Sequence, residues 1–153
     1  MSGIDVPDSG AVHPEAAGGI AFNGRVGQGV ADTVLRIIAD QPAVTTICDL
    51  GCGNGYLAGQ LGSRGYTVVG VDASKTYLDI AREHNSSARV TFVDGLIDAD
   101  LVRQLGATHG PFDLVVSSDV IEHLYDPLEF LKTAFALLRP GGTAVIGTPY
   151  HGY

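Results

Sequence analysis

The chain has 153 residues, of which 45% are hydrophobic and 17% are charged, and this is enough for one domain with one core. Its net charge of −8 argues against a surface for nucleic acid or anionic lipid. No apolar run approaches the ~20 residues that span a bilayer, and the start lacks the pattern of a secretory signal. We therefore expect a cytoplasmic protein, with Cys48 and Cys52 as buried thiols.

The N-terminal 19 residues mix Gly, Pro, Ser and Asp without periodicity. They are expected to form a mobile arm (1–19), which leaves 20–153 for the domain. A helix is predicted over 30–39, with Val34 and Ile38 on its apolar face. The first strand is expected over 45–50, because a short β-branched run closed by glycine is typical of a buried parallel strand.

Helices and strands alternate from there to the C-terminus. Strands are predicted over 67–71, 89–93, 112–117 and 143–147, and helices over 57–64, from Ser74, over 98–105 and from Asp126. The apolar stripe expected on the last helix consists of Leu128, Leu131, Ala134, Phe135 and Leu138, and 139–142 should end that helix. This alternation predicts an α/β fold with a parallel sheet of about five strands and helices on both faces.

A glycine-rich turn, Asp-Leu-Gly-Cys-Gly-Asn-Gly, follows the first predicted strand at 49–55. Glycine allows a sharp turn and lets a ligand approach the backbone closely. The second predicted strand ends at Asp72, where an acid can accept hydrogen bonds from a ribose diol. A dinucleotide site would need its third glycine at Tyr56, and Asp49 would repel a pyrophosphate but attract an ammonium group. The pattern favours a nucleoside joined to a cationic amino acid.

Together with 93–95, 112–116 and 138–142, these motifs resemble the class I S-adenosylmethionine-dependent methyltransferases over about residues 23–151. The chain is similar to the ubiquinone-biosynthesis O-methyltransferase group among them. The resemblance implies a Rossmann-like fold and transfer of a methyl group from S-adenosylmethionine to a small-molecule acceptor, with oxygen as the expected acceptor atom. The alternative is a non-catalytic or regulatory domain that binds the cofactor but lacks a complete acceptor lobe.

The family resemblance also implies which residues surround the cofactor. Those expected at the methionine end are Asp49, Gly51, Cys52, Gly53, Gly55, Ser118 and Asp119. Those expected at the adenosine end are Asp72, Ala73, Asp94, Gly95 and Leu96. In this assignment Asp72 would take the ribose hydroxyls and Asp94 the adenine amino group.

The segment from Asp119 to His123 is similar to the E-x-x-E-H segment of that group. On a helical turn, Asp119, Glu122 and His123 would project to one side, and His151 would lie at the same edge of the sheet. Three interpretations stay open. The four residues could ligate a divalent metal; His123 could act as a general base, assisted by Glu122 and His151; or Glu122 and His123 could serve only the fold and the pocket lid. We expect catalytic roles without a metal, because an aspartate replaces the first glutamate.

Family members continue after the fifth strand with a helix and an antiparallel strand pair, which this sequence is expected to lack. The fifth strand would then leave an open edge of the sheet. The sequence could be part of a longer methyltransferase, a second copy could cover the edge in a homodimer, or the domain could be a minimal form. The expected partners are a small-molecule acceptor and a second copy, without nucleic acid or a membrane.

Overall fold

Five strands pair into one parallel sheet in the order β3-β2-β1-β4-β5. The computed structural model describes residues 29–148. Its strands are β1 (Thr46–Leu50), β2 (Thr67–Asp72), β3 (Val90–Asp94), β4 (Phe112–Ser118) and β5 (Leu138–Gly147). Each strand overlaps a predicted one, so the predicted α/β fold with a five-stranded parallel sheet is confirmed. This order places β1 at the centre, between β2 and β4.

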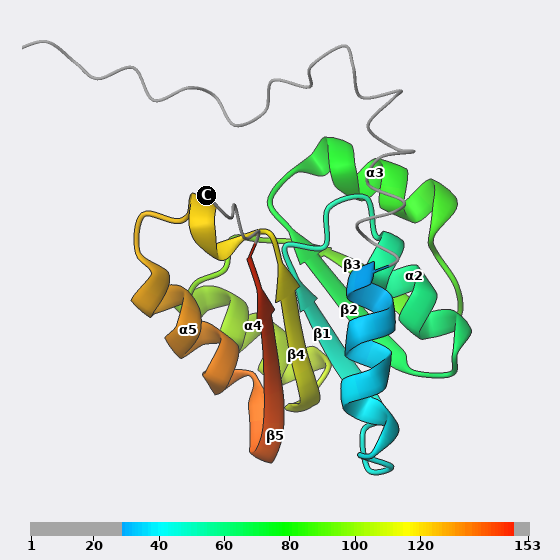
Figure 1. The fold of residues 1–153 in the computed structure, drawn as a ribbon. Helices are drawn as coiled ribbons and strands as arrows, with labels where there is room; N and C mark the ends of the chain where they lie inside the picture. The colour runs from blue at the N-terminus through cyan, green and yellow to red at the C-terminus, as the bar shows by residue number, and fades with distance from the viewer. Residues whose placement is uncertain (1–28, 149–153) are drawn as a thin grey trace, which may run out of the picture.

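Helices cover both faces of the sheet (Figure 1). They are a helix at 29–39, α2 (Tyr56–Ser63), α3 (Lys75–His84), α4 (Ala99–Thr108), the 3-10 helix η1 (Ile121–His123) and α5 (Pro127–Ala136). The helix at 29–39, α2 and α3 pack on one face, and α4 and α5 pack on the other. Neighbouring strand residues alternate between the two cores, as Ile47 and Cys48 do, because side chains of a strand point to opposite faces in turn.

Polar side chains fix the starts of three helices. Ser74 Oγ accepts a hydrogen bond from the backbone N–H of Tyr77 at the start of α3. Asp126 Oδ1 accepts from the amides of the first turn of α5, which has a proline at its first position. Both residues were predicted as the starts of these helices. Asp98 does the same for α4, which continues to Thr108, three residues past its predicted end.

The predicted apolar stripe of α5 is wrong in part. Leu128 and Phe135 are 62% and 61% exposed, whereas Phe130, Ala134 and Leu137 are buried against the sheet. The sequence of α5 carries two apolar stripes at helical spacing, and only docking on the sheet selects one of them.

The predicted start of β5 is also wrong, because the strand begins at Leu138 rather than Thr143. Leu138 pairs with Phe112 and Thr143 pairs with Leu114, so four residues of β5 face a single residue of β4 between these pairs. The glycine-rich stretch that was expected to separate helix from strand is accommodated as an irregularity inside the strand.

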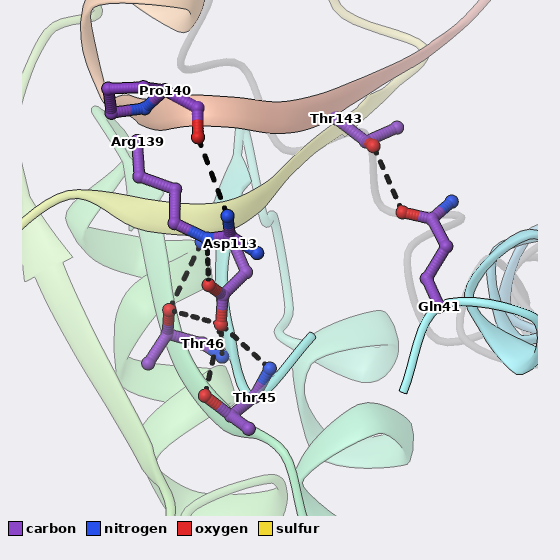
Figure 2. Close-up of polar contacts among 7 residues, drawn as sticks. All are labelled: Gln41, Thr45, Thr46, Asp113, Arg139, Pro140 and Thr143. Atoms are coloured by element: carbon purple, nitrogen blue, oxygen red, sulfur yellow. Dashed lines mark hydrogen bonds and ion pairs between the residues drawn. The ribbon is translucent and has the colours of Figure 1, made fainter. Parts of the chain in front are cut away.

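Asp113 fastens the amino ends of β1, β4 and β5 together (Figure 2). Its Oδ2 accepts hydrogen bonds from the backbone amides of Thr45 (2.7 Å) and Thr46 (2.9 Å) and from both hydroxyls (3.0 Å each). Arg139 Nε donates to Oδ1. Burial raises the pKa of this carboxyl, but the amide and guanidinium hydrogen bonds outweigh burial and hold the pKa well below its usual range. Asp113 thus anchors the starts of these three strands to one another.

The outer edge of β5 pairs with no other strand among residues 29–148. That a second copy covers this edge stays a prediction, which sedimentation of the purified chain tests. The predicted mobile arm (1–19) lies outside the described residues. None of the described helices combines the length and apolarity that crossing a bilayer requires.

Candidate functional site

A cleft of about 1010 Å³ lies at the carboxyl ends of β1, β2, β3 and β4. Open parallel sheets bind ligands at this edge, next to the point where the strand order reverses. Most of the predicted site residues line the cleft, namely Asp49, Gly51, Cys52, Gly53, Asp72, Ala73, Gly95, Leu96, Ser118, Asp119 and His123. The fold therefore brings together residues that come from four separate strand ends.

The glycine turn between β1 and α2 is supported by Phe92 on β3 and by Asn85 at the end of α3. Gly55 does not line the cleft; it packs on the ring of Phe92, where a Cβ atom would lie only 2.5 Å from Cζ. The side chain of Asn85, at the end of α3, donates from Nδ2 to the carbonyl of Asn54 at 2.8 Å. Gly55 therefore has a packing role, and its expected contact with the ligand stays a prediction. Asn85 is a support that the motif itself does not reveal.

Asp72, at the end of β2, is held by two backbone amides. Its Oδ2 accepts from Gly53 N and its Oδ1 from Ser74 N, both at 2.8 Å. A carboxylate oxygen has a second lone pair, so each oxygen can accept one further hydrogen bond. The side chain is therefore fixed in orientation at the cleft and can still receive two donors from a ligand.

Asp49, at the end of β1, is only 2% exposed. Its Oδ2 has no hydrogen-bond partner among the described residues. Burial, and secondly the negative charge of Asp72, raise the pKa of the Asp49 carboxyl to about 7. A buried polar atom without a partner is costly, so this side of the cleft suits a ligand with a hydrogen-bond donor, and a cation best of all.

Three of the predicted adenosine-side residues line the cleft beside Asp72: Ala73, Gly95 and Leu96. Asp94 does not line it; its Oδ2 lies 3.9 Å from Lys75 Nζ on α3. Its expected contact with an adenine amino group stays a prediction.

The turn after β4 carries the candidate catalytic residues. Asp119 has a left-handed backbone (φ 58°) and donates its N–H to Gly147 O at 3.0 Å, which ties it to the end of β5. His123, on η1, lines the cleft with a 76% exposed side chain. Glu122 lies outside the cleft lining, with its Oε1 3.8 Å from His123 Nε2 and its Oε2 accepting from Thr148 Oγ1 at 3.2 Å.

The predicted convergence of Asp119, Glu122 and His123 on one helical face is not formed. Residues 29–148 contain no group of three His, Cys, Asp or Glu side chains that could hold a metal ion. The physical reason is local: η1 is a single 3-10 turn, and Asp119 precedes it in a left-handed conformation instead of belonging to an α-helical turn. His151 lies outside the described residues.

The profile of the family described as methyltransferase domain matches residues 22–152. The chain belongs to this family. Among curated proteins, the methyltransferase domain is 37% identical over 102 residues to the ubiquinone biosynthesis O-methyltransferase of Caulobacter sp. (strain K31), and 32% identical over 104 residues to that of Vibrio parahaemolyticus. These matches cover 67% of the chain but 40% and 43% of the two relatives. The chain thus spans less than half of the curated relatives it matches.

Solved structures show the same fold. The S-adenosylmethionine-bound amino pentose methyltransferase CalS10 from Micromonospora echinaspora superposes with a TM-score of 0.68, at 24% identity, over 88% of this chain and 56% of its own. An S-adenosylmethionine-dependent methyltransferase from Mesorhizobium loti gives a TM-score of 0.61, at 28% identity, over 78% and 54%. The Rossmann-like architecture expected from the sequence is therefore confirmed.

The methyltransferase domain also places residues at the cleft that the sequence analysis missed. They include Lys75 and Tyr77 on α3, Ile97 after β3, and Val120 and Leu124 around η1. Val120 packs directly over Gly51, where a Cβ atom would lie 2.3 Å from Val120 Cγ2. The signal for Ile97 and Val120 is their place just beyond predicted strand ends, whereas Tyr77 comes to the cleft through the packing of α3.

Proposed function

We propose that this methyltransferase domain binds S-adenosylmethionine in the cleft and transfers its methyl group to an oxygen atom of a small-molecule acceptor. The observation that carries the proposal is the pair of aspartates at the ends of the adjacent strands β1 and β2. An ammonium group would supply the partner that Asp49 Oδ2 lacks, and two ribose hydroxyls would use the free lone pairs of Asp72. The donors of S-adenosylmethionine fit both carboxyls, whereas a pyrophosphate would be repelled by them.

When bound, S-adenosylmethionine supplies a methyl group on a positively charged sulfur, which is reactive towards in-line attack. The contribution of the protein is then to orient the two reactants and to exclude water. His123 lies on the cleft and can accept the proton of an acceptor hydroxyl. Glu122, which accepts a hydrogen bond from Thr148, can orient the imidazole from 3.8 Å away.

Two observations support oxygen as the acceptor atom. A hydroxyl acceptor has a proton to lose, and His123 offers a base at the cleft. The curated relatives are named as O-methyltransferases that act in ubiquinone biosynthesis. We extend this property to the present chain, and phenols are the first acceptors to test.

Isothermal titration calorimetry with S-adenosylmethionine tests the binding step. We expect the parent chain to bind and Asp72→Ala to bind at least tenfold more weakly, since hydrogen bonds to a charged group contribute about 1.5–3 kcal/mol each. Asp100→Ala is the matched control, because Asp100 lies on α4 outside the cleft lining. Binding by neither the parent nor the control would refute the proposal.

Formation of S-adenosylhomocysteine with a panel of phenols, amines and carbon acids tests the chemical step. We expect turnover with phenols, and a kcat for His123→Gln that is lower by about 10²-fold or more, the range for loss of a general base. Turnover of any acceptor also excludes the alternative of a domain that only binds the cofactor. Turnover confined to amines would contradict the assignment to oxygen.

A further inference from the structure

Two buried aspartates on the central strands have opposite surroundings. Asp113, near the start of β4, is 9% exposed, and its two oxygens receive hydrogen bonds from Thr45, Thr46 and Arg139 (Figure 2). Asp49, at the end of β1, is more deeply buried and has an oxygen without any partner among the described residues. The carboxyl group of Asp113, at the amino ends of the strands, therefore has donors for its negative charge. The carboxyl group of Asp49, at their carboxyl ends, has an oxygen that lacks one.

The groups around Asp49 do not compensate its charge. In the sheet its neighbours are Gly70 on β2 and Val116 on β4, neither of which titrates. The carboxylic acids that line the cleft with Asp49 are Asp72, Asp98 and Asp119. The weaker acids near Asp49 are Cys52, Tyr56 and Tyr77 on the cleft and Cys48, which precedes Asp49 on β1. From the helix at 29–39, uncharged Val30 lines the cleft.

Two basic side chains among residues 29–148, those of Lys75 and His123, line the same cleft, and neither pairs with Asp49. Lys75 Nζ lies 3.9 Å from Asp94, and His123 Nε2 lies 3.8 Å from Glu122. A carboxylate that is buried without a cation is strongly disfavoured relative to the neutral acid. The geometry alone therefore favours a protonated Asp49 in the free protein.

We propose that Asp49 is a neutral carboxylic acid in the free protein, and that it gives up its proton when the ammonium group of the ligand docks against it. This inference rests on the proposed function, since it concerns the same cleft. The O–H bond of the acid breaks, its proton passes to the solvent buffer, and a carboxylate–ammonium pair forms. The pKa of about 7 caused by burial and by Asp72 places this exchange within the range of ordinary buffers.

The number of protons released on binding should therefore depend on the ligand. For a pKa of about 7 in the free protein, binding releases about 0.9 proton at pH 6 and about 0.1 at pH 8. The Kd therefore rises about tenfold for each pH unit as the pH falls below 7. Methylthioadenosine has the same nucleoside but no amino-acid end, so its binding should release no proton and should not depend on pH in this way.

The experiment is calorimetry of the full chain at pH 6 and pH 8, in buffers of different ionisation enthalpy, with S-adenosylhomocysteine and methylthioadenosine as probes. The change of observed heat with buffer enthalpy gives the number of protons released. We expect release with S-adenosylhomocysteine alone, and none from Asp49→Asn, whose amide mimics the neutral acid. Because an imidazole ordinarily titrates in the same pH range, His123→Gln is the matched control, and it should keep the release.

Each outcome decides the matter. Binding of S-adenosylhomocysteine without proton release at pH 6 overturns this inference and leaves the proposed function standing. Release that persists in Asp49→Asn, or that disappears in His123→Gln, also overturns it, because the proton then comes from another group. If neither probe binds at either pH, the proposed function fails and this inference fails with it.

Discussion

The glycine turn contains two glycines whose substitution should cost very different amounts of stability. Gly53 and Gly55 both have positive φ, 51° and 76°, so alanine at either position incurs the left-handed backbone penalty of about 1–2 kcal/mol. A Cβ atom at Gly53 would meet nothing within 4 Å. At Gly55 it would lie 2.5 Å from Phe92 Cζ and 2.8 Å from Ala81 Cβ, and such overpacking adds about 1–3 kcal/mol.

We therefore expect Gly55→Ala to lower the free energy of unfolding by about 2–5 kcal/mol and Gly53→Ala by about 1–2 kcal/mol. Urea unfolding of the two variants and the parent measures the difference, with an unchanged m-value as the sign that the comparison is valid. In a Phe92→Leu background, Gly55→Ala should cost less, because the smaller side chain can move away. Equal losses for the two alanine variants, together with no coupling to Phe92, would refute the packing argument.

Three further predictions follow from the polar contacts. Asp113→Ala should lower the free energy of unfolding by at least about 1.5–3 kcal/mol, the contribution of one hydrogen bond to a charged group, measured with urea at pH 7, because the two amides and the partly exposed Arg139 lose their buried partner. Asn85→Ala should raise the Kd for S-adenosylmethionine about fivefold in calorimetry, the equivalent of one hydrogen bond of about 1 kcal/mol to the Asn54 carbonyl. Because the pKa of Asp49 is raised to about 7 in the folded state, the parent should lose up to about 4 kcal/mol of stability as the pH rises from 4 to 8; unfolding of Asp49→Asn across that range should lack this loss.

Local chemistry was sufficient to predict much of this protein. The alternation of helices and strands, the caps at Ser74 and Asp126, and the glycine turn between two acids all depend on residues close together in the chain. Because carboxyl ends of parallel strands meet at one edge, the sequence also predicts that Asp49 and Asp72 share a cleft.

Tertiary packing decided which face of a helix is buried and which side chains reach the cleft, because the sequence allows more than one arrangement of each. The sequence of α5 offers two apolar stripes, and docking on the sheet buried the one with Phe130. The single 3-10 turn of η1 brought His123 to the cleft and left Glu122 outside its lining. Asn85 contacts the glycine turn at Asn54, which lies 31 residues earlier in the chain. Asp49 Oδ2 is buried without a hydrogen-bond partner among the described residues because of how the surrounding elements pack. Contacts between distant segments leave no local pattern, so no reading of neighbouring residues could have found them.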